Sequence, residues 1–244
     1  MKLASLLFMP KKAPRFQLLV AHGFRGRKEN SGRIHVFAEM ITNLAGGSLL
    51  AFDFTGSGQS EGCFAEMTLS SQIQDLIAVI KYSTSRDNTP LIILGRSFGG
   101  STALAAGAGH PMVSGIALWS APVLMERTFD RLYPHEMEQL RRGQKTTVAD
   151  ELGNFSLLPS FANDLNQHDF TKYLQAINCP VLVVQGEADE VVDPENAMFI
   201  KKHSATDAEV HLIPAAGHRF EGIQTRREEI TLAWLRKYWG EESE

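Results

Sequence analysis

Six short apolar runs constrain the fold of this chain more than any other feature of its sequence. Each is followed within two residues by a glycine, proline, serine or aspartate, and they occupy residues 18–21, 49–52, 91–94, 116–119, 181–184 and 210–213. Continuous apolar runs of this length are typical of strands that are covered on both faces, as in a parallel sheet. The sequence therefore predicts a mostly parallel central sheet.

The segments between these runs have the apolar spacing of helices. Residues 34, 37, 38 and 41 are apolar at helical intervals, and so are residues 73, 76, 77 and 80, with Thr68 or Ser70 as the N-cap. The C-terminal stretch 225–239 has the same pattern. Strands that alternate with helices predict an α/β fold with helices on both faces of the sheet.

One long segment interrupts the alternation. Between Ser120 and Cys179 there is no convincing buried strand, but there are turn signals at Gly143 and Gly153 and clustered apolar residues. Because a structureless loop of this length is uncommon in a compact domain, we expect a small, mainly helical lid insertion at about 121–178. No linker or repeat divides the chain, so residues 1–244 are predicted to form one domain.

The chemistry is suggested first by residues 95–99, which read Gly-Arg-Ser-Phe-Gly. They follow a buried strand and precede a run of small residues that favours a helix. This is the context of a nucleophile elbow, in which glycines permit a strained turn that exposes the serine hydroxyl. We expect Ser97 to be the nucleophile; the alternative is an idle serine in a glycine-rich turn.

A serine nucleophile needs a general base and an acid that orients it. His218 follows the last predicted strand and is the best candidate for the base. Asp189 lies in the turn after the preceding strand and is the favoured acid. Asp193 is the second choice, better explained as a helix N-cap before a proline, and Glu187 is the third.

Two backbone amides are expected to bind the oxyanion. One is that of Phe98, directly after the nucleophile, and the other is that of Phe24, in the loop after the strand 18–21. The side chain of His22 is expected to brace this loop. In the insertion, Phe155, Leu158 and Phe161 could line an apolar substrate pocket, or could only pack the insertion onto the body.

The loop from Asp53 to Gly62 invites a dinucleotide-binding interpretation that the sequence does not support. Gly56 and Gly58 are present, but the third glycine of the fingerprint is replaced by Glu61. A polar structural loop is the better prediction. No metal-ligand cluster is apparent either, so we expect no cofactor and no metal.

Taken together, these motifs resemble those of the α/β-hydrolase superfamily over nearly the whole chain. They are His22-Gly23-Phe24, the glycines and serine of the loop from Asp53, the elbow 95–99, Gly186-x-x-Asp189 and Gly217-His218. The similarity is greatest to the serine-aminopeptidase-like and cinnamoyl/feruloyl-esterase-like group, which also carries a helical insertion before the strand that leads to the acid. The resemblance implies a Ser-His-Asp hydrolase.

The first hypothesis for the activity is therefore cleavage of a carboxylic ester through an acyl-enzyme. A peptidase, an aminopeptidase or a thioesterase would use the same residues. A non-catalytic binding protein on a hydrolase scaffold is the alternative from another class, but every triad position holds a competent residue.

The overall charge and the termini bear on partners and location. A formal net charge of −4 argues against nucleic acid as a partner, and no stretch is apolar enough for a membrane span. Residues 1–9 are interpreted as a first strand rather than a secretion signal. We expect a cytoplasmic protein with free thiols at Cys63 and Cys179, acting on a small-molecule ester; the sequence leaves a homodimer open.

Overall fold

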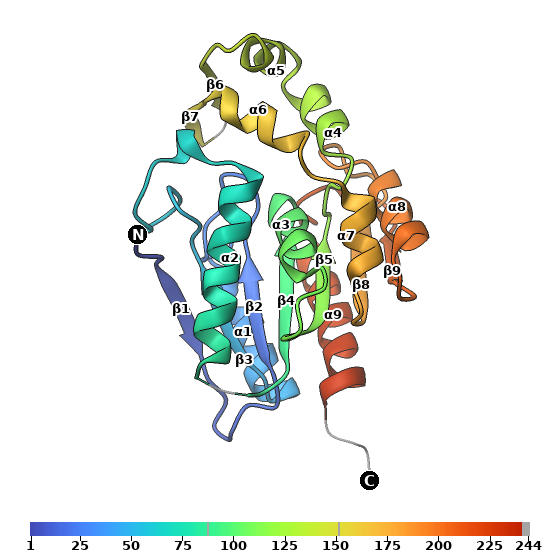
Figure 1. Cartoon of the computed structure of the whole chain (residues 1–244). Coiled ribbons are helices and arrows are strands. Elements are labelled where there is room, and N and C mark those ends of the chain that lie inside the picture. The colour runs from blue at the N-terminus through green and yellow to red at the C-terminus, as the bar shows by residue number, and fades with distance from the viewer. Residues whose placement is uncertain (87, 151, 241–244) are drawn as a thin grey trace.

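The computed structural model describes residues 1–86, 88–150 and 152–240. In these residues, seven strands form one sheet (Figure 1) in the order β1-β3-β2-β4-β5-β8-β9. Only β1 is antiparallel to its neighbour in this sheet. The strands are β1 (Ser5–Phe8), β2 (Gln17–Ala21), β3 (Ser48–Phe52), β4 (Leu91–Arg96), β5 (Val113–Trp119), β8 (Val181–Gly186) and β9 (Glu209–Ile213).

Helices cover both faces of the sheet and form two apolar cores with it. One face packs against α1 (Ile34–Met40), its π-helical continuation η1 (Ile41–Ala45) and α9 (Gln224–Trp239). The other packs against α2 (Leu69–Thr84), α3 (Phe98–Gly107), α7 (Phe170–Ala176) and α8 (Glu195–His203). The predicted α/β fold with a mostly parallel sheet is thus confirmed.

The two cores explain why the central strands carry continuous apolar runs. Successive side chains of a strand point to opposite faces. In β2, Leu18 and Val20 belong to the α1–α9 core, whereas Leu19 and Ala21 belong to the core under α2 and α3. Successive residues of the central strands are therefore removed from water by one helical layer or the other, whereas the edge strands β1 and β9 keep exposed positions.

The predicted start of α2 depends on a local capping arrangement. The Thr68 hydroxyl accepts a hydrogen bond from the Ser71 amide, and the Ser71 hydroxyl accepts one from the Thr68 amide, each at 3.0 Å. This reciprocal pair satisfies two backbone donors at the helix end. Ser70, the other N-cap candidate, lies inside the helix.

Between β5 and α7 the chain forms helices and a separate hairpin beyond the ends of the parallel strands (Figure 1), whereas α7 itself returns to the face of the sheet. The helices before α7 are α4 (Met125–Leu132), α5 (Pro134–Arg141) and α6 (Pro159–Leu165), and β6 (Thr146–Asp150) pairs antiparallel with β7 (Gly153–Leu157). A short 3-10 turn, η2 (Phe64–Glu66), lies in the body beside β7.

The hairpin corrects the expectation that this segment contains no strand. Its apolar residues alternate instead of forming a continuous run: Val148 is buried in β6, and Phe155 and Leu157 are buried in β7. One face of the hairpin is exposed, so its strands have a half-buried pattern that a search for continuous apolar runs does not detect.

Candidate active site

Ser97 lies in the sharp turn between β4 and α3. Its backbone has φ 50° and ψ −126°, a conformation that costs a residue with a Cβ atom free energy. The Ser97 amide donates to the Trp119 carbonyl at 2.8 Å, which ties the turn to the end of β5. The hydroxyl is thereby held at the carboxyl edge of the sheet, at the N-terminus of α3.

The glycines on either side of Ser97 are required by close backbone contacts. A Cβ atom on Gly99 would lie 2.3 Å from the His22 carbonyl oxygen, and one on Gly95 would lie 2.4 Å from the Gly99 carbonyl oxygen. Both distances are far below van der Waals contact. The elbow can therefore pack against the end of β2 only because these positions lack side chains.

Pairing of β8 with β9 brings two further predicted residues to the same edge. Beyond the strands, the Ala188 amide donates to the Ala216 carbonyl at 3.0 Å, so the two loops run side by side. His218 Nε2 lies 3.1 Å from Ser97 Oγ, and His218 Nδ1 lies 3.0 Å from Asp189 Oδ2. A carboxylate only accepts, so Nδ1–H donates to Asp189 and Nε2 accepts from the Ser97 hydroxyl.

Asp189 is buried and fully supplied with hydrogen-bond donors. Its Oδ1 accepts from the amides of Val191 and Val192, at 2.9 and 2.8 Å, and its Oδ2 accepts from Gln185 Nε2 at 2.8 Å. Burial favours the neutral acid, but the hydrogen bond and charge of His218, with the Val192 amide, outweigh it and lower the pKa of Asp189. The carboxylate is therefore the stable form beside His218.

The two other carboxylates considered for the acid lie elsewhere. Asp193 Oδ1 accepts from the Glu195 amide at 2.9 Å, at the start of α8, and Glu187 is exposed. Glu190 accepts from the backbone amide of His218 at 3.3 Å but does not bind its ring. Among the carboxylates of the described residues, the His218 side chain is hydrogen-bonded to Asp189 alone.

The loop after β2 is braced by His22. Its Nδ1 lies 2.8 Å from the Gly23 carbonyl oxygen, and its Nε2 lies 3.1 Å from the Phe54 amide nitrogen. The carbonyl accepts and the amide donates, so the proton is on Nδ1 and the ring is neutral. Burial lowers the pKa of His22, despite the raising effect of the Gly23 carbonyl, which agrees with a neutral ring.

This loop lies directly against Ser97. A Cβ atom on Gly23 would meet Ser97 Cβ at 3.0 Å, and the rings of Phe24 and Phe98 are 6.1 Å apart. Within the described part of the chain, the backbone amides of Phe24 and Phe98 donate no hydrogen bond. The N–H groups of both predicted oxyanion donors are therefore free, and the two residues are neighbours in space.

A buried ion pair anchors the same loop to the one after β3. Asp53 accepts from both the amide and the ammonium of Lys28 at 2.7 Å, and from the Gln59 amide at 3.0 Å. Burial would raise the pKa of Asp53, but the hydrogen bonds from Gln59 and Lys28 prevail and lower it. Residues 53–62 thus serve as a polar structural loop, as the sequence indicates.

An aromatic cluster joins the insertion to Phe24 and to Phe98, the residue after Ser97. The Phe24 ring contacts six other rings with centroid distances of 5.5–6.3 Å; these belong to Phe64, Phe98, Phe129, Tyr133, Phe155 and Phe161. The structure thus brings Phe155 and Phe161, two of the predicted pocket residues, to the candidate site. Leu158 is half-buried outside both apolar cores, and its amide donates to the Ala65 carbonyl at 3.3 Å.

Arg25 connects the insertion to the loop that carries Phe24. Its guanidinium donates to Asp150 Oδ1 at 2.5 Å, to the Gly153 carbonyl at 2.9 Å and to the Leu152 carbonyl at 3.2 Å. It also lies 4.4 Å over the Phe155 ring. The tip of the β6–β7 hairpin is therefore attached to the residue that follows a predicted oxyanion donor.

Sequence reasoning missed four residues that contribute to this arrangement. Gln185 interrupts the apolar strand β8, and a buried amide in a strand should have suggested a hydrogen-bond partner. Phe129 and Tyr133 are four residues apart, a helical spacing that could have placed both rings on one face. Arg25 had no comparable signal, because its partner Asp150 is distant in sequence.

Other structural observations concern metals, membranes and thiols. Over the described ranges, no three His, Cys, Asp or Glu side chains are grouped as a metal site would require. None of the helices in those ranges combines the length and the apolar character that crossing a membrane requires. Both cysteines are free, Cys63 exposed and Cys179 buried, and burial raises the pKa of the Cys179 thiol to about 11.

Comparison with known proteins identifies the family and several relatives. The sequence model of the family described as serine aminopeptidase, S33, matches residues 12–222. Human mitochondrial palmitoyl-protein thioesterase ABHD10 is 26% identical over 187 residues, 74% of this chain and 60% of the relative. A monoacylglycerol lipase of Mycolicibacterium smegmatis is 26% identical over 232 residues, 84% of this chain and 81% of the relative.

The fold also matches solved structures. Est1E from Butyrivibrio proteoclasticus, with ferulic acid bound, has a TM-score of 0.76 at 21% identity, and the match covers 97% of this chain and 93% of Est1E. At this identity the likeness concerns the fold. The chain spans about 60% of the length of the human and Pongo abelii ABHD10 relatives that it matches.

Proposed function

Since this chain belongs to the serine aminopeptidase S33 family of α/β-hydrolases, we propose that it hydrolyses carboxylic esters through an acyl-enzyme on Ser97. The observation that carries the proposal is the chain of hydrogen bonds from Ser97 Oγ through His218 to Asp189, at 3.1 and 3.0 Å. A serine hydroxyl is a poor nucleophile until a base removes its proton, and His218 Nε2 is within reach of that proton.

In the acylation step, Ser97 Oγ attacks the acyl carbon while its proton passes to His218 Nε2. Asp189 keeps Nδ1–H oriented and stabilises the imidazolium. The amides of Phe24 and Phe98 bind the oxyanion, and because they have no other partner in the described residues they need no rearrangement. The tetrahedral intermediate then collapses, and His218 gives the proton to the departing alcohol.

In the deacylation step, a water molecule replaces the alcohol. His218 Nε2 takes a proton from the water as its oxygen attacks the acyl carbon, and Ser97 leaves with that proton. The carboxylic acid is released and the starting arrangement is restored. The same two amides bind the second oxyanion, so one set of residues serves both steps.

Residues 121–178 act as a lid on the single domain, and the aromatic cluster forms the floor of the acyl site. The rings of Phe129, Phe155 and Phe161 lie against Phe24 and Phe98, directly beside the nucleophile. An apolar acyl or aryl group could pack against these rings through the same kind of apolar contact that the rings make with one another. A free peptide amine would require a carboxylate there, which favours an apolar ester over an aminopeptidase substrate.

A thioester is the second candidate substrate. It is supported by the likeness to ABHD10, a palmitoyl-protein thioesterase, whereas the ester is supported by the likeness to a monoacylglycerol lipase. Both substrates would use the same hydrogen-bonded residues, because the acyl-enzyme is identical. The two substrates differ only in the leaving group, which is an alcohol for the ester and a thiol for the thioester.

A fluorophosphonate probe tests the nucleophile. The wild-type protein should be labelled and the Ser97→Ala variant should not, because the probe phosphonylates only an activated serine, with loss of fluoride. Ser101→Ala is a matched control, since Ser101 is on the adjacent helix and its hydroxyl binds the Pro122 carbonyl. Absence of labelling in the wild type, or equal labelling of Ser97→Ala, would support the non-catalytic alternative.

A substrate panel tests the reaction. p-Nitrophenyl esters, acyl-coenzyme A thioesters and aminoacyl anilides should be compared by kcat/KM on one preparation. We expect apolar p-nitrophenyl esters to be cleaved best. Strong anilide cleavage with negligible ester turnover would refute the ester hydrolase proposal, and a preference for thioesters would select the second candidate.

A further inference from the structure

A small cavity lies beside the candidate active site, on the opposite face of the sheet from the aromatic cluster. Its volume is about 60 Å³, and it is bounded by residues 20–31 and the ends of β4 and β5. Among its apolar lining residues, Val20, Leu94 and Trp119 belong to the α1–α9 core and Ala21 belongs to the other, and no ring of the aromatic cluster lines it. The cavity is thus distinct from the proposed acyl site.

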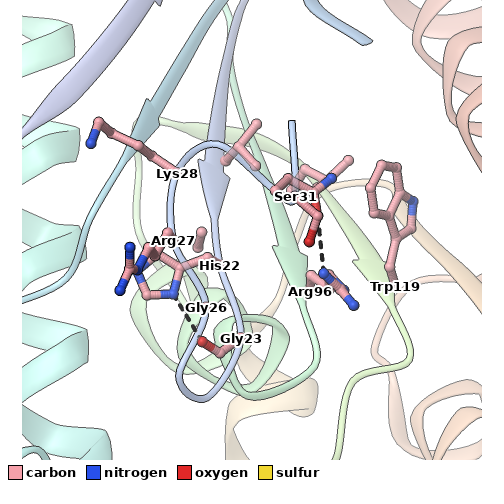
Figure 2. A pocket seen from close by; sticks show the side chains of 12 residues that line it. His22, Gly23, Gly26, Arg27, Lys28, Ser31, Arg96 and Trp119 are labelled. Atoms are coloured by element: carbon pink, nitrogen blue, oxygen red, sulfur yellow. Dashed lines mark hydrogen bonds between the residues drawn. The ribbon is translucent and has the colours of Figure 1, made fainter. Parts of the chain in front are cut away.

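The lining is rich in cations and contains no carboxylate. Arg27, Lys28 and Arg96 line the cavity (Figure 2). The Lys28 ammonium is neutralised by Asp53 at 2.7 Å and by Glu29 at 2.8 Å. For Arg27 and Arg96, no carboxylate partner exists within the described residues.

Arg96 is the best-placed of these cations. It immediately precedes Ser97, and its Nη1 donates to Asn30 Oδ1 at 2.9 Å, its one hydrogen bond from the side chain in the described residues. Burial, and then the charge of Arg219, lower the pKa of Arg96, while the charge of Asp189 opposes them. A guanidinium has five N–H donors, so most of its donors remain available.

A second arginine adds positive charge behind the cavity wall. Arg227 is 2% exposed, its Cζ lies 4.3 Å over the Trp119 ring, and its Nε and Nη1 are buried without a partner among the described residues. Burial, and then the charge of Arg96, lower the pKa of Arg227 to about 9, so it is still charged at neutral pH. The charge of Glu228 opposes this lowering, but neither the partly buried Arg96 nor the buried Arg227 has a hydrogen-bonded carboxylate in the described residues.

We propose that this cavity binds a small oxyanion, a phosphate or a carboxylate, through the Arg96 guanidinium. The planar fork of an arginine matches two oxygens of such a group. A cavity of about 60 Å³ holds several waters, since one water needs about 10–15 Å³ by this measure, and a phosphate or acetate is of that size. The anion offsets the charge of Arg96, whereas Arg227 does not line the cavity and contributes only from behind Trp119.

Thermal unfolding of the protein with added anion tests the site. Sodium phosphate and sodium acetate are titrated separately, at an ionic strength kept constant with sodium chloride. At least one oxyanion should raise Tm in a saturable manner beyond the effect of chloride, because a ligand that binds only the folded state stabilises it. Comparison of the phosphate titration with the acetate titration identifies whether phosphate or a carboxylate is the preferred ligand.

Variants of Arg96 locate the binding. Arg96→Gln should reduce the affinity at least tenfold, and Arg96→Lys, which keeps the charge but loses the fork, should also weaken it. The exposed Arg86→Gln, at the end of α2, is the matched control and should bind like the wild type. No saturable shift in the wild type, or an equal shift in Arg96→Gln, would overturn the proposal.

A second readout does not depend on substituting Arg96. Trp119 lines the cavity, so phosphate or acetate should change the indole fluorescence of the wild type with the same midpoint as the Tm titration. Trp119→Phe should lose this signal. Each measurement reports binding rather than turnover, so a negative result leaves the ester hydrolase proposal untouched.

Discussion

At the scale of single residues, the candidate site depends on how Asp189 is held. Its two oxygens accept from two backbone amides, from Gln185 and from His218, all at 2.8–3.1 Å. An isolated carboxylate in this buried position would take up a proton. The donors keep it ionised, so it can fix the tautomer of His218.

We expect Asp189→Asn to lower kcat on a p-nitrophenyl ester by about 10³–10⁴-fold, because an amide can stabilise the wrong tautomer of His218. KM should change little, since Asp189 does not contact substrate. Asp193→Asn is the control and should retain near wild-type activity. Steady-state kinetics of the three proteins would contradict the assignment if Asp193→Asn were the more impaired variant.

His22 should make stability depend on pH. Its pKa is lowered from 6.5 in the folded protein by burial, so below that pH the unfolded chain binds a proton that the folded protein does not. Stability should therefore fall as pH decreases from 6.5 toward the folded pKa, by up to about 1.4 kcal/mol per pH unit for one proton. Above pH 6.5 this contribution is constant.

Urea unfolding at pH 5, 6, 7 and 8 measures this effect. His22→Gln, which does not titrate at position 22, should show a shallower loss of unfolding free energy between pH 7 and pH 5 than the wild type. His35→Gln serves as the control, because it changes a different histidine on α1. Parallel curves for the wild type and His22→Gln would contradict the prediction.

At the scale of structural elements, the β6–β7 hairpin and the loop after β2 are connected through Arg25. The ion pair with Asp150 is largely buried on the arginine side, with 14% of that side chain exposed. Two carbonyls of the hairpin tip and the Phe155 ring complete its contacts. Motion of the hairpin would therefore disturb the residue next to Phe24.

We expect Arg25→Gln to loosen the hairpin without unfolding the sheet. Amide hydrogen exchange at Val148 and Phe155, which are paired across the hairpin, should be about tenfold faster, whereas exchange in β4 should be unchanged. Arg142→Gln is the control, since it removes only an exposed ion pair with Glu138 on α5. Equal exchange in Arg25→Gln and the wild type would show that Arg25 does not hold the hairpin.

At the scale of the whole molecule, the sheet separates two apolar cores. Ile34 on α1 is buried in one and Ile80 on α2 in the other, and both are fully shielded from water. Because neither side chain shares a contact cluster with the other, a change in one core should not be transmitted by packing to its counterpart.

Ile34→Val and Ile80→Val should each lower the free energy of unfolding by about 0.5–1.5 kcal/mol. In the double variant the two losses should add to within about 0.5 kcal/mol. Ile93→Val combined with Ile80→Val, two residues of the same core, is the comparison pair. The free energies of unfolding are measured with urea for all single and double variants. A larger deviation from additivity for Ile34→Val with Ile80→Val than for Ile93→Val with Ile80→Val would contradict separate cores.

The sequence alone determined the features that depend on neighbours along the chain. Apolar runs such as 91–94 predicted buried strands because each residue must be covered on one face or the other. Gly95 and Gly99 predicted the elbow because only glycine permits such a close backbone contact. The strand order then allowed Ser97, Asp189 and His218 to be proposed together, since parallel strands end at one edge.

Only the tertiary structure decided matters that join distant residues. Arg25 and Asp150 have no relation in the sequence, and β6 and β7 were missed because a half-buried hairpin has alternating rather than continuous apolar residues. The packing of the loops likewise decides that Asp189, and not Asp193, binds His218. It also forms the cavity beside Arg96. Local patterns specify the elements and their chemistry, whereas side-chain contacts across the fold specify which polar groups are satisfied and which remain available.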